Sequence, residues 1–196
     1  MPAALRKVTR EDIVPDAEFR LQRKERRARL LPRKALRRVA VGPWCTFYFE
    51  CFETMLFQIQ EMLLIEKGGE AQIADELAAY NPLIPQGGEL IATVMFEVDD
   101  PARRARILAG LGRIEHRFEI RVGRERIAGV PEGDAERSRE DGKTSAVHFL
   151  RFSFTEDQVR AFRESPEPVT IACDDLRYLH MAGLSPESRA ELAADL

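Results

Sequence analysis

The clearest pattern of hydrophobic and polar residues runs from Trp44 to Lys67, where the period changes from that of a strand to that of a helix. Residues 44–51 alternate, which gives a strand with one side made of Cys45, Phe47, Phe49 and Cys51 and the other of Trp44, Thr46, Tyr48 and Glu50. From Phe52 the spacing is helical and gathers on one side Phe52, Met55, Ile59, Met62 and Leu63. We therefore expect a strand over 44–51 that leads directly into a helix over 52–67.

The residues before this segment predict a charged helix and a hairpin. Residues 16–31 are strongly charged with few apolar positions, which is typical of a helix lying on a surface. Pro32 is expected to end this helix, because proline has no backbone N–H and clashes with the preceding turn. Residues 37–41 form a short strand, and the Gly42-Pro43 pair after it predicts a hairpin with the next strand.

The rest of the chain alternates strands and helices. Helical spacing and capping residues predict helices over 70–80, 101–111, 155–164 and from 186 onward. Apolar runs predict strands over 89–98, 115–122, 145–154 and 169–173. Residues 124–130 could add a hairpin partner, and without them the second half reads β-α-β-β-α-β. We therefore predict an α+β protein with an antiparallel sheet of this ferredoxin-like type and an added N-terminal layer of helix and hairpin.

The domain organisation follows from length and charge. The chain of 196 residues suits one domain or one and a half, and it is long enough for a hydrophobic core. We expect a basic N-terminal helical arm over 1–36, a single α+β domain over 37–180 and a C-terminal helix over 181–196.

Two predicted strands, 89–98 and 145–154, are apolar on both sides. A strand of this kind is covered on both sides by other elements. The local helices cover one side, so we expect the helix over 52–67 to cover the other.

The charges are unevenly distributed. Residues 1–39 hold 13 Lys and Arg against 5 Asp and Glu, a net charge of +8, and the remainder carries −11 because the whole chain carries −3. This asymmetry fits a charged helix packed on an acidic body, and it also fits a basic arm for an acidic partner or nucleic acid. The basic segment lacks interleaved aromatic residues and a nucleic-acid motif, so we do not expect nucleic-acid binding.

The cysteines and the N-terminus indicate a cellular compartment. Cys45 and Cys51 lie on one strand about 20 Å apart, too far for a disulfide. With Cys173 they form no CxxC pair of the kind that binds metals. The N-terminus lacks the apolar region of a signal peptide, and no apolar run is long enough to span a membrane. We expect a reduced, cytoplasmic protein.

Polar residues enter the apolar layer between the central helix and the sheet. Gln58 and Glu61 lie on one stripe of the helix over 52–67, and strand alternation directs other charged residues toward that helix. We predict one polar cluster made of Glu50, Gln58, Glu61, Glu97 and Arg151.

Two further polar residues lie at apolar positions, Glu66 on the helix and His148 on a strand. Carboxylates with a histidine suit a metal ion, and Glu61, Glu66 and His148 are the candidate ligands. The same residues also suit a structural network in which His148 is hydrogen-bonded in the core and Glu66 reaches water or an arginine. The chain has no P-loop, GxGxxG, HExxH or GxSxG motif, and the sequence assigns neither a catalytic residue nor a cofactor.

Several segments together carry a resemblance to a known family, namely RRVAVGP, FYFE, FQIQEMLLIE, AYNPLIP, ATVMFEVDDPARR and TSAVHFLRF. They resemble a bacterial domain-of-unknown-function family (three-five-zero-one) over about Thr9 to Tyr178, and QIQEM and YNPLIP are the most specific. Genes of that family tend to lie beside those for rubrerythrin and an iron–sulfur protein of the heterodisulfide-reductase type, which implies a redox or oxidative-stress context. The family usually has an Asp-His-Pro-x-Tyr-like end to its last strand. Residues 174–178 read DDLRY here, and the missing histidine weakens a metal role for them.

Two functions follow from these observations. The first is an accessory protein that docks on a redox partner, rubrerythrin or the iron–sulfur protein, through the charged N-terminal helix and the loop 131–143. The alternative is a metal-binding protein or metal-dependent enzyme that uses Glu61, Glu66 and His148. We expect the first.

Overall fold

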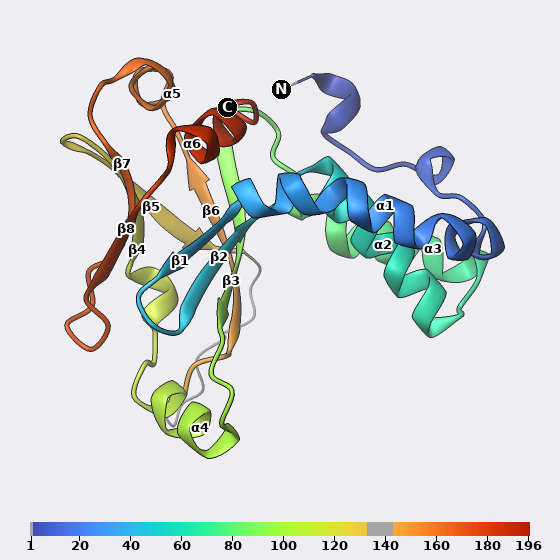
Figure 1. Cartoon of the computed structure of the whole chain (residues 1–196), viewed down its shortest axis with the longest axis horizontal. Helices are drawn as coiled ribbons and strands as arrows, with labels where there is room; N and C mark the ends of the chain where they lie inside the picture. Colours follow the sequence, from blue (N-terminus) through green and yellow to red (C-terminus); the bar gives the residue numbers. More distant parts are fainter. Residues whose placement is uncertain (1, 133–142) are drawn as a thin grey trace.

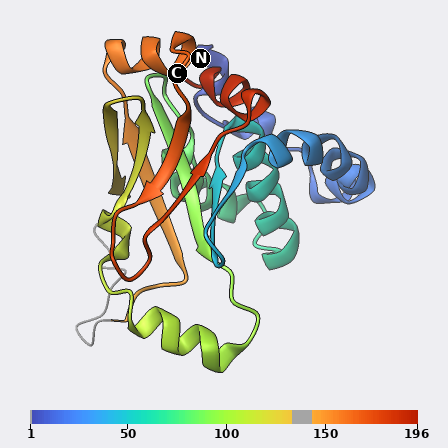
Figure 2. The ribbon, with the colours of Figure 1, turned by 60° about the vertical axis from the view of Figure 1, so that its left-hand side comes forward.

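The computed structural model describes residues 2–132 and 143–196. Its strands are β1 (Arg38–Val41), β2 (Cys45–Phe49), β3 (Glu89–Phe96), β4 (Phe118–Val122), β5 (Glu125–Pro131), β6 (Val147–Ser153), β7 (Val169–Cys173) and β8 (His180–Gly183). They form one eight-stranded sheet in the order β1-β2-β3-β6-β5-β4-β7-β8, in which each pair of neighbours is antiparallel. The sheet curls so that its two edge strands, β1 and β8, lie against each other (Figure 2). The result is a nearly closed barrel.

Helices lie beside the barrel and at both of its ends (Figure 1). The α-helices are α1 (Asp16–Leu36), α2 (Phe52–Glu66), α3 (Glu70–Tyr80), α4 (Pro101–Ala109), α5 (Glu156–Glu164) and α6 (Pro186–Ala193). The 3-10 turns are η1 (Ala3–Leu5), η2 (Arg10–Asp12), η3 (Asn81–Leu83) and η4 (Ile114–His116). The first three α-helices form a layer on one side of the barrel, α4 lies at one end, and α5 with α6 lies at the other.

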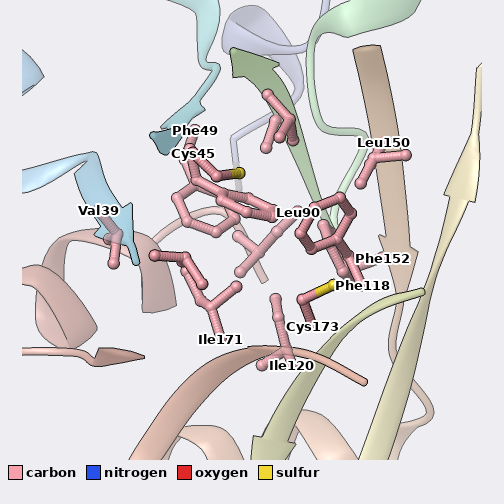
Figure 3. Close-up of a cluster of buried hydrophobic side chains, with 14 of the residues drawn as sticks. Val39, Cys45, Phe49, Leu90, Phe118, Ile120, Leu150, Phe152, Ile171 and Cys173 are labelled. Atoms are coloured by element: carbon pink, nitrogen blue, oxygen red, sulfur yellow. The ribbon is translucent and has the colours of Figure 1, made fainter. Parts of the chain in front are cut away.

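The larger apolar core fills the barrel (Figure 3). Strand alternation directs one side of every strand inward. The Phe47 and Phe118 rings come from opposite halves of the sheet and meet edge to face, with 5.2 Å between their centroids. Leu108 of α4, Phe162 of α5 and Leu192 of α6 extend this core at the two ends. Burial of this apolar interior is what holds the curled sheet together.

A second core lies between the helical layer and the outer side of the sheet. Met55 and Ile59 of α2 pack with Ile91 of β3, and Phe149 of β6 packs against the same cluster. The prediction that this helix covers the outer side of the two doubly apolar strands is therefore confirmed. The helical layer forms one wall of the candidate site, and the sheet forms the other.

Strand β5 joins the two halves of the barrel. Residues 125–128 pair with β4, while residues 129–131 pair with β6. Gly129 stands at the change of partner, and a Cβ atom there would lie 2.9 Å from the Phe152 ring and 3.1 Å from the Phe118 carbonyl oxygen. The close approach at this bend requires a residue without a side chain.

The prediction of a ferredoxin-like β-α-β-β-α-β sheet is wrong. Residues 125–131, treated as optional in that prediction, form the central strand β5 between β6 and β4. The hairpin of β1 and β2 is part of the same sheet and not an added layer, because β2 pairs with β3 along its whole length. Strand β8, residues 180–183, is too short and too exposed to give a recognisable periodicity.

Helix α1 is longer than predicted. It passes through Pro32 and ends at Leu36. Because Pro32 has no N–H group, the carbonyl of Ala28 loses its hydrogen bond within the helix. Both residues lie on the exposed side of the helix, so water can bind that carbonyl. Beyond the proline, Arg33 is ion-paired with Glu53 and Glu191, which anchors the last turn. Most of the loop predicted over 131–143 lies outside the described residues.

Candidate functional site

A cleft of about 400 Å³ opens between α2, the turn η3 and the outer side of β2, β3 and β6. Its size falls within the range of ordinary small-molecule sites. The walls are largely aromatic and apolar, and the polar and charged lining residues are Lys34, Arg37, Glu50, Thr54, Gln58 and Thr93. The strand alternation of the sequence explains this position, because Tyr48, Thr93 and Phe149 belong to the sides of β2, β3 and β6 that face away from the barrel core.

Glu50 lines the cleft and is a buried carboxylate, with 8% of its surface exposed. Thr93 donates a hydrogen bond to its Oε1 atom and Thr54 to its Oε2 atom, each at 2.6 Å. Two such short bonds hold the carboxylate in one orientation. The sequence predicted Glu50, and helical spacing puts Thr54 on the polar stripe of Gln58 and Glu61. It gave no signal for Thr93, because a hydroxyl in a strand is common.

Arg37 lies directly behind Glu50 and is 1% exposed. Its guanidinium donates to the carbonyl of Phe49 at 2.9 Å and to that of Glu50 at 2.7 Å. It also forms ion pairs with Glu191, at 3.0 Å, and with Asp195. The C-terminal segment thereby clamps the junction of α1, β2 and α2, and sequence reasoning missed this clamp because its partners are 158 residues apart.

The structure brings two of the five predicted cluster residues together and separates the other three. Glu50 and Gln58 both line the cleft. Glu61 forms a bidentate ion pair with Arg23 of α1, with both distances 2.7 Å. The single cluster predicted from the sequence does not form, because each remaining charge meets an oppositely charged or polar neighbour of its own.

The two charged strand residues of the predicted cluster lie at different places. Glu97 accepts a hydrogen bond from Tyr48 at 2.8 Å. Burial acts to raise its pKa, but hydrogen bonds from neighbouring hydroxyls and the charge of Arg38 outweigh it and leave the pKa below its ordinary value. Arg151 forms an ion pair with Glu89 at 2.5 Å and another with Glu132. It therefore ties β6 to the start of β3 and the end of β5.

The metal-ligand candidates lie apart. Glu66 is exposed at the end of α2, where Gln72 donates to it at 2.6 Å. His148 is fully buried, and its Nε2 atom lies 2.9 Å from the Ser145 carbonyl oxygen. In residues 2–132 and 143–196, no group of three or more His, Cys, Asp and Glu side chains is placed to hold a metal ion.

The residues that follow β7 are structural in this fold. Arg177 binds both carboxylate oxygens of Asp175, at 2.8 and 2.5 Å, and the carbonyls of Gly110 and Gly112 at 3.0 and 3.1 Å. Hydrogen bonding by Arg177 lowers the pKa of Asp175 to about 2. Next to this pair, the buried Tyr178 hydroxyl reaches the β1–β2 turn.

The three cysteines are free and buried. Burial raises the pKa of Cys45 well above its ordinary value, and it raises that of Cys173 to about 11. Nucleophilic or redox chemistry of cysteine needs the thiolate, which these surroundings disfavour.

A groove of about 310 Å³ lies on the outer side of the helical layer, between α1 and α2. Its floor is apolar and is built from Phe19, Leu30, Leu56 and Phe57. Its α1 side carries three arginines, Arg26, Arg29 and Arg33. The groove is distinct from the cleft, because it opens between two helices and not between helix and sheet. Among the helices of the described residues, none has the length and apolar character to cross a bilayer.

The fold defines a class of protein: a nearly closed antiparallel β-barrel with a layer of helices on one side, where the cleft and the groove lie. The family model "Protein of unknown function (DUF3501)" matches residues 7–196, and the chain belongs to this family. The chain is similar to a solved protein from Burkholderia pseudomallei K96243, described as a novel protein of unknown function. Identity is 36%, the TM-score is 0.89, and the match covers 97% of this chain and 99% of the other. No curated protein matches the chain.

Proposed function

We propose that this chain is a cytoplasmic accessory protein that docks a redox partner in the groove between α1 and α2. The observation that carries the proposal is the combination of an apolar floor and a rim of arginines in that groove. Such a groove suits an amphipathic segment that lays apolar side chains on the floor and carboxylates beside the rim. The partner surface is therefore acidic.

The charge of α1 supports an acidic partner. The helix carries eight basic and three acidic residues. Some of these charges are already neutralised within the chain, since Arg23 pairs with Glu61 and Arg33 with Glu53. Arg26 instead donates to the neutral amide of Gln22 at 2.8 Å, and Arg29, 79% exposed, pairs with a glutamate that is itself 64% exposed. Exposed pairs of this kind are weak and exchange readily for a partner's carboxylates.

The identity of the partner rests on family membership. Genes of the family tend to lie beside those for rubrerythrin and an iron–sulfur protein, which makes these two proteins the proposed partners. All three cysteines of the chain are buried, which disfavours the reactive thiolate form. This supports an accessory role, in which the partner and not this chain carries out the redox chemistry.

Binding of the purified full-length chain to each of the two redox proteins tests the proposal. We expect measurable affinity for at least one of them, falling as salt is raised because the contact is electrostatic. The double variant Arg26→Glu/Arg29→Glu is expected to weaken binding about tenfold or more, since it reverses two charges of the rim.

The matched control is Lys24→Glu/Arg27→Glu, which makes the same change of net charge on the same helix. Both residues are exposed, and helical spacing places them away from the groove. This control should leave the affinity within about twofold. If neither redox protein binds, or if the two double variants weaken binding equally, the proposal is wrong.

A further inference from the structure

We propose that the cleft between α2 and the outer side of the sheet is a binding site for a small organic amine with an apolar or aromatic body. The site is separate from the α1–α2 groove, so it does not depend on the proposed function. The site consists of a floor around Glu50 and a wall of aromatic side chains.

The floor of the cleft offers hydrogen-bond acceptors. A threonine hydroxyl has one hydrogen, and Thr93 and Thr54 both direct theirs to Glu50 at 2.6 Å. For Thr54 the carboxylate is the nearer acceptor, because the alternative Cys51 carbonyl is 3.0 Å away. The remaining lone pairs of the Glu50 carboxylate and the Thr93 hydroxyl can only accept hydrogen bonds. A ligand that binds to these oxygen atoms must therefore carry a hydrogen-bond donor, such as an ammonium group.

The negative charge of Glu50 is not cancelled by Arg37. That guanidinium contacts the backbone carbonyl of Glu50 at 2.7 Å, and its charge is matched by Glu191 and the buried Asp195. Lys34 is the other cation that lines the cleft, and it is exposed. A cation bound at the floor is therefore attracted by the buried carboxylate of Glu50. The repulsion from Lys34 is weaker, because water screens the charge of an exposed lysine.

Four aromatic residues line the cleft, and apart from Phe49, which belongs to the barrel core, they are Tyr48, Tyr80 and Phe149. The faces of aromatic rings attract cations as well as apolar groups. The Tyr48 ring already has the Arg38 guanidinium carbon 5.6 Å from its centroid, so it accepts a cation in this structure. Aromatic rings around one carboxylate are a combination suited to an amine that carries an apolar body.

Three probes with the same aromatic body separate the possible occupants: 2-phenylethylamine, 3-phenylpropanoate and 2-phenylethanol. Their dissociation constants for the full-length chain are measured at neutral pH by calorimetry and ligand-observed NMR. We expect the amine to bind about tenfold or more tightly than the carboxylate and more tightly than the alcohol. If the carboxylate binds as well as the amine, or if none of the three binds at millimolar concentration, the proposal is overturned.

Two variants of charged lining residues test whether the site takes a cation. Glu50→Gln keeps the shape and an acceptor for one threonine, and it should weaken amine binding about tenfold or more. Lys34→Ala should leave amine binding unchanged or tighten it, whereas a site for anions would show the reverse for both variants. Glu66→Gln, at the exposed end of α2, makes the same charge change as Glu50→Gln and should have no effect.

A thermal unfolding curve of Glu50→Gln shows whether the variant is folded. If Glu50→Gln were to unfold, Tyr80→Ala provides the second test, because it removes one aromatic ring from the edge of the cleft and leaves the carboxylate in place. It should weaken the amine about threefold or more. Unchanged amine affinity in a folded Glu50→Gln or Tyr80→Ala variant contradicts the proposal.

Discussion

Replacing Arg37 with alanine is expected to lower the free energy of unfolding by about 3–5 kcal/mol. The guanidinium is 1% exposed and Asp195 is 3% exposed, so the variant keeps a buried carboxylate without its partner. The carbonyls of Phe49 and Glu50 also lose their donor. Urea denaturation followed by circular dichroism measures the change.

The same variant should show a characteristic dependence on pH. Burial raises the pKa of Asp195 above its ordinary value even beside Arg37, and removal of Arg37 raises it further. A carboxyl whose folded pKa is raised contributes stability that is fully present below its unfolded pKa, about 4, and lost as pH rises through the folded pKa. The difference in stability between wild type and Arg37→Ala should therefore grow as pH rises through the folded pKa of Asp195 in the wild type, which lies above its ordinary value.

Arg33→Ala is the matched control for this prediction. Arg33 lies one turn earlier on α1 and shares Glu191 with Arg37, but its side chain is 32% exposed. Water can solvate the carboxylates that this substitution frees, so the expected loss is about 0–1 kcal/mol. A loss for Arg37→Ala no larger than that for Arg33→Ala would show that the clamp does not hold the C-terminal segment in place.

Tyr178→Phe is expected to cost about 1–3 kcal/mol, although it removes a single oxygen atom. The Tyr178 hydroxyl donates to the carbonyl of Val41 at 2.8 Å and accepts from the N–H groups of Trp44 and Cys45, both at 3.0 Å. It thereby joins the β1–β2 turn to the start of β8 and closes the barrel. Gly42 makes this contact possible, because its φ is +72° and a Cβ atom there would lie 2.5 Å from the His180 ring.

Tyr48→Phe provides the comparison, since the Tyr48 hydroxyl bonds an exposed carboxylate, that of Glu97. Its removal should change stability by about 0.5 kcal/mol or less. Amide hydrogen exchange adds a local measurement, because the Cys45 N–H should lose protection in Tyr178→Phe. Equal losses for the two tyrosine variants would mean that the closure of the barrel does not depend on this hydroxyl.

Local sequence patterns predicted the elements better than their assembly. The hairpin before Phe52 and the helix that covers Ile91 follow from periodicity and turn residues, which act over a few positions. The position of β5 between β6 and β4 depends on the bend at Gly129, where two strands come too close for a side chain. A sequence shows a glycine there, but it does not show what the backbone must approach.

The residues of the cleft could be predicted only in part, as could the fold. Alternation and helical spacing directed Glu50 and Gln58 toward the same layer, where both now line the cleft. Glu61 lies outside that layer, because it is paired with Arg23 of α1. The position of α1 could not be derived from the pattern of residues in α2. Ion pairs between distant segments depend on the final packing, which is why the Arg37–Asp195 pair was not predicted.

Hydrogen–deuterium exchange of the full chain, alone and with each redox protein, tests partner docking in the α1–α2 groove most directly. We expect slower exchange in complex with a partner over residues 16–36 and 52–60, which form the two sides of the groove, and little change in the barrel strands. Protection confined to the barrel strands, or unchanged exchange in both helices with a partner bound, would contradict it.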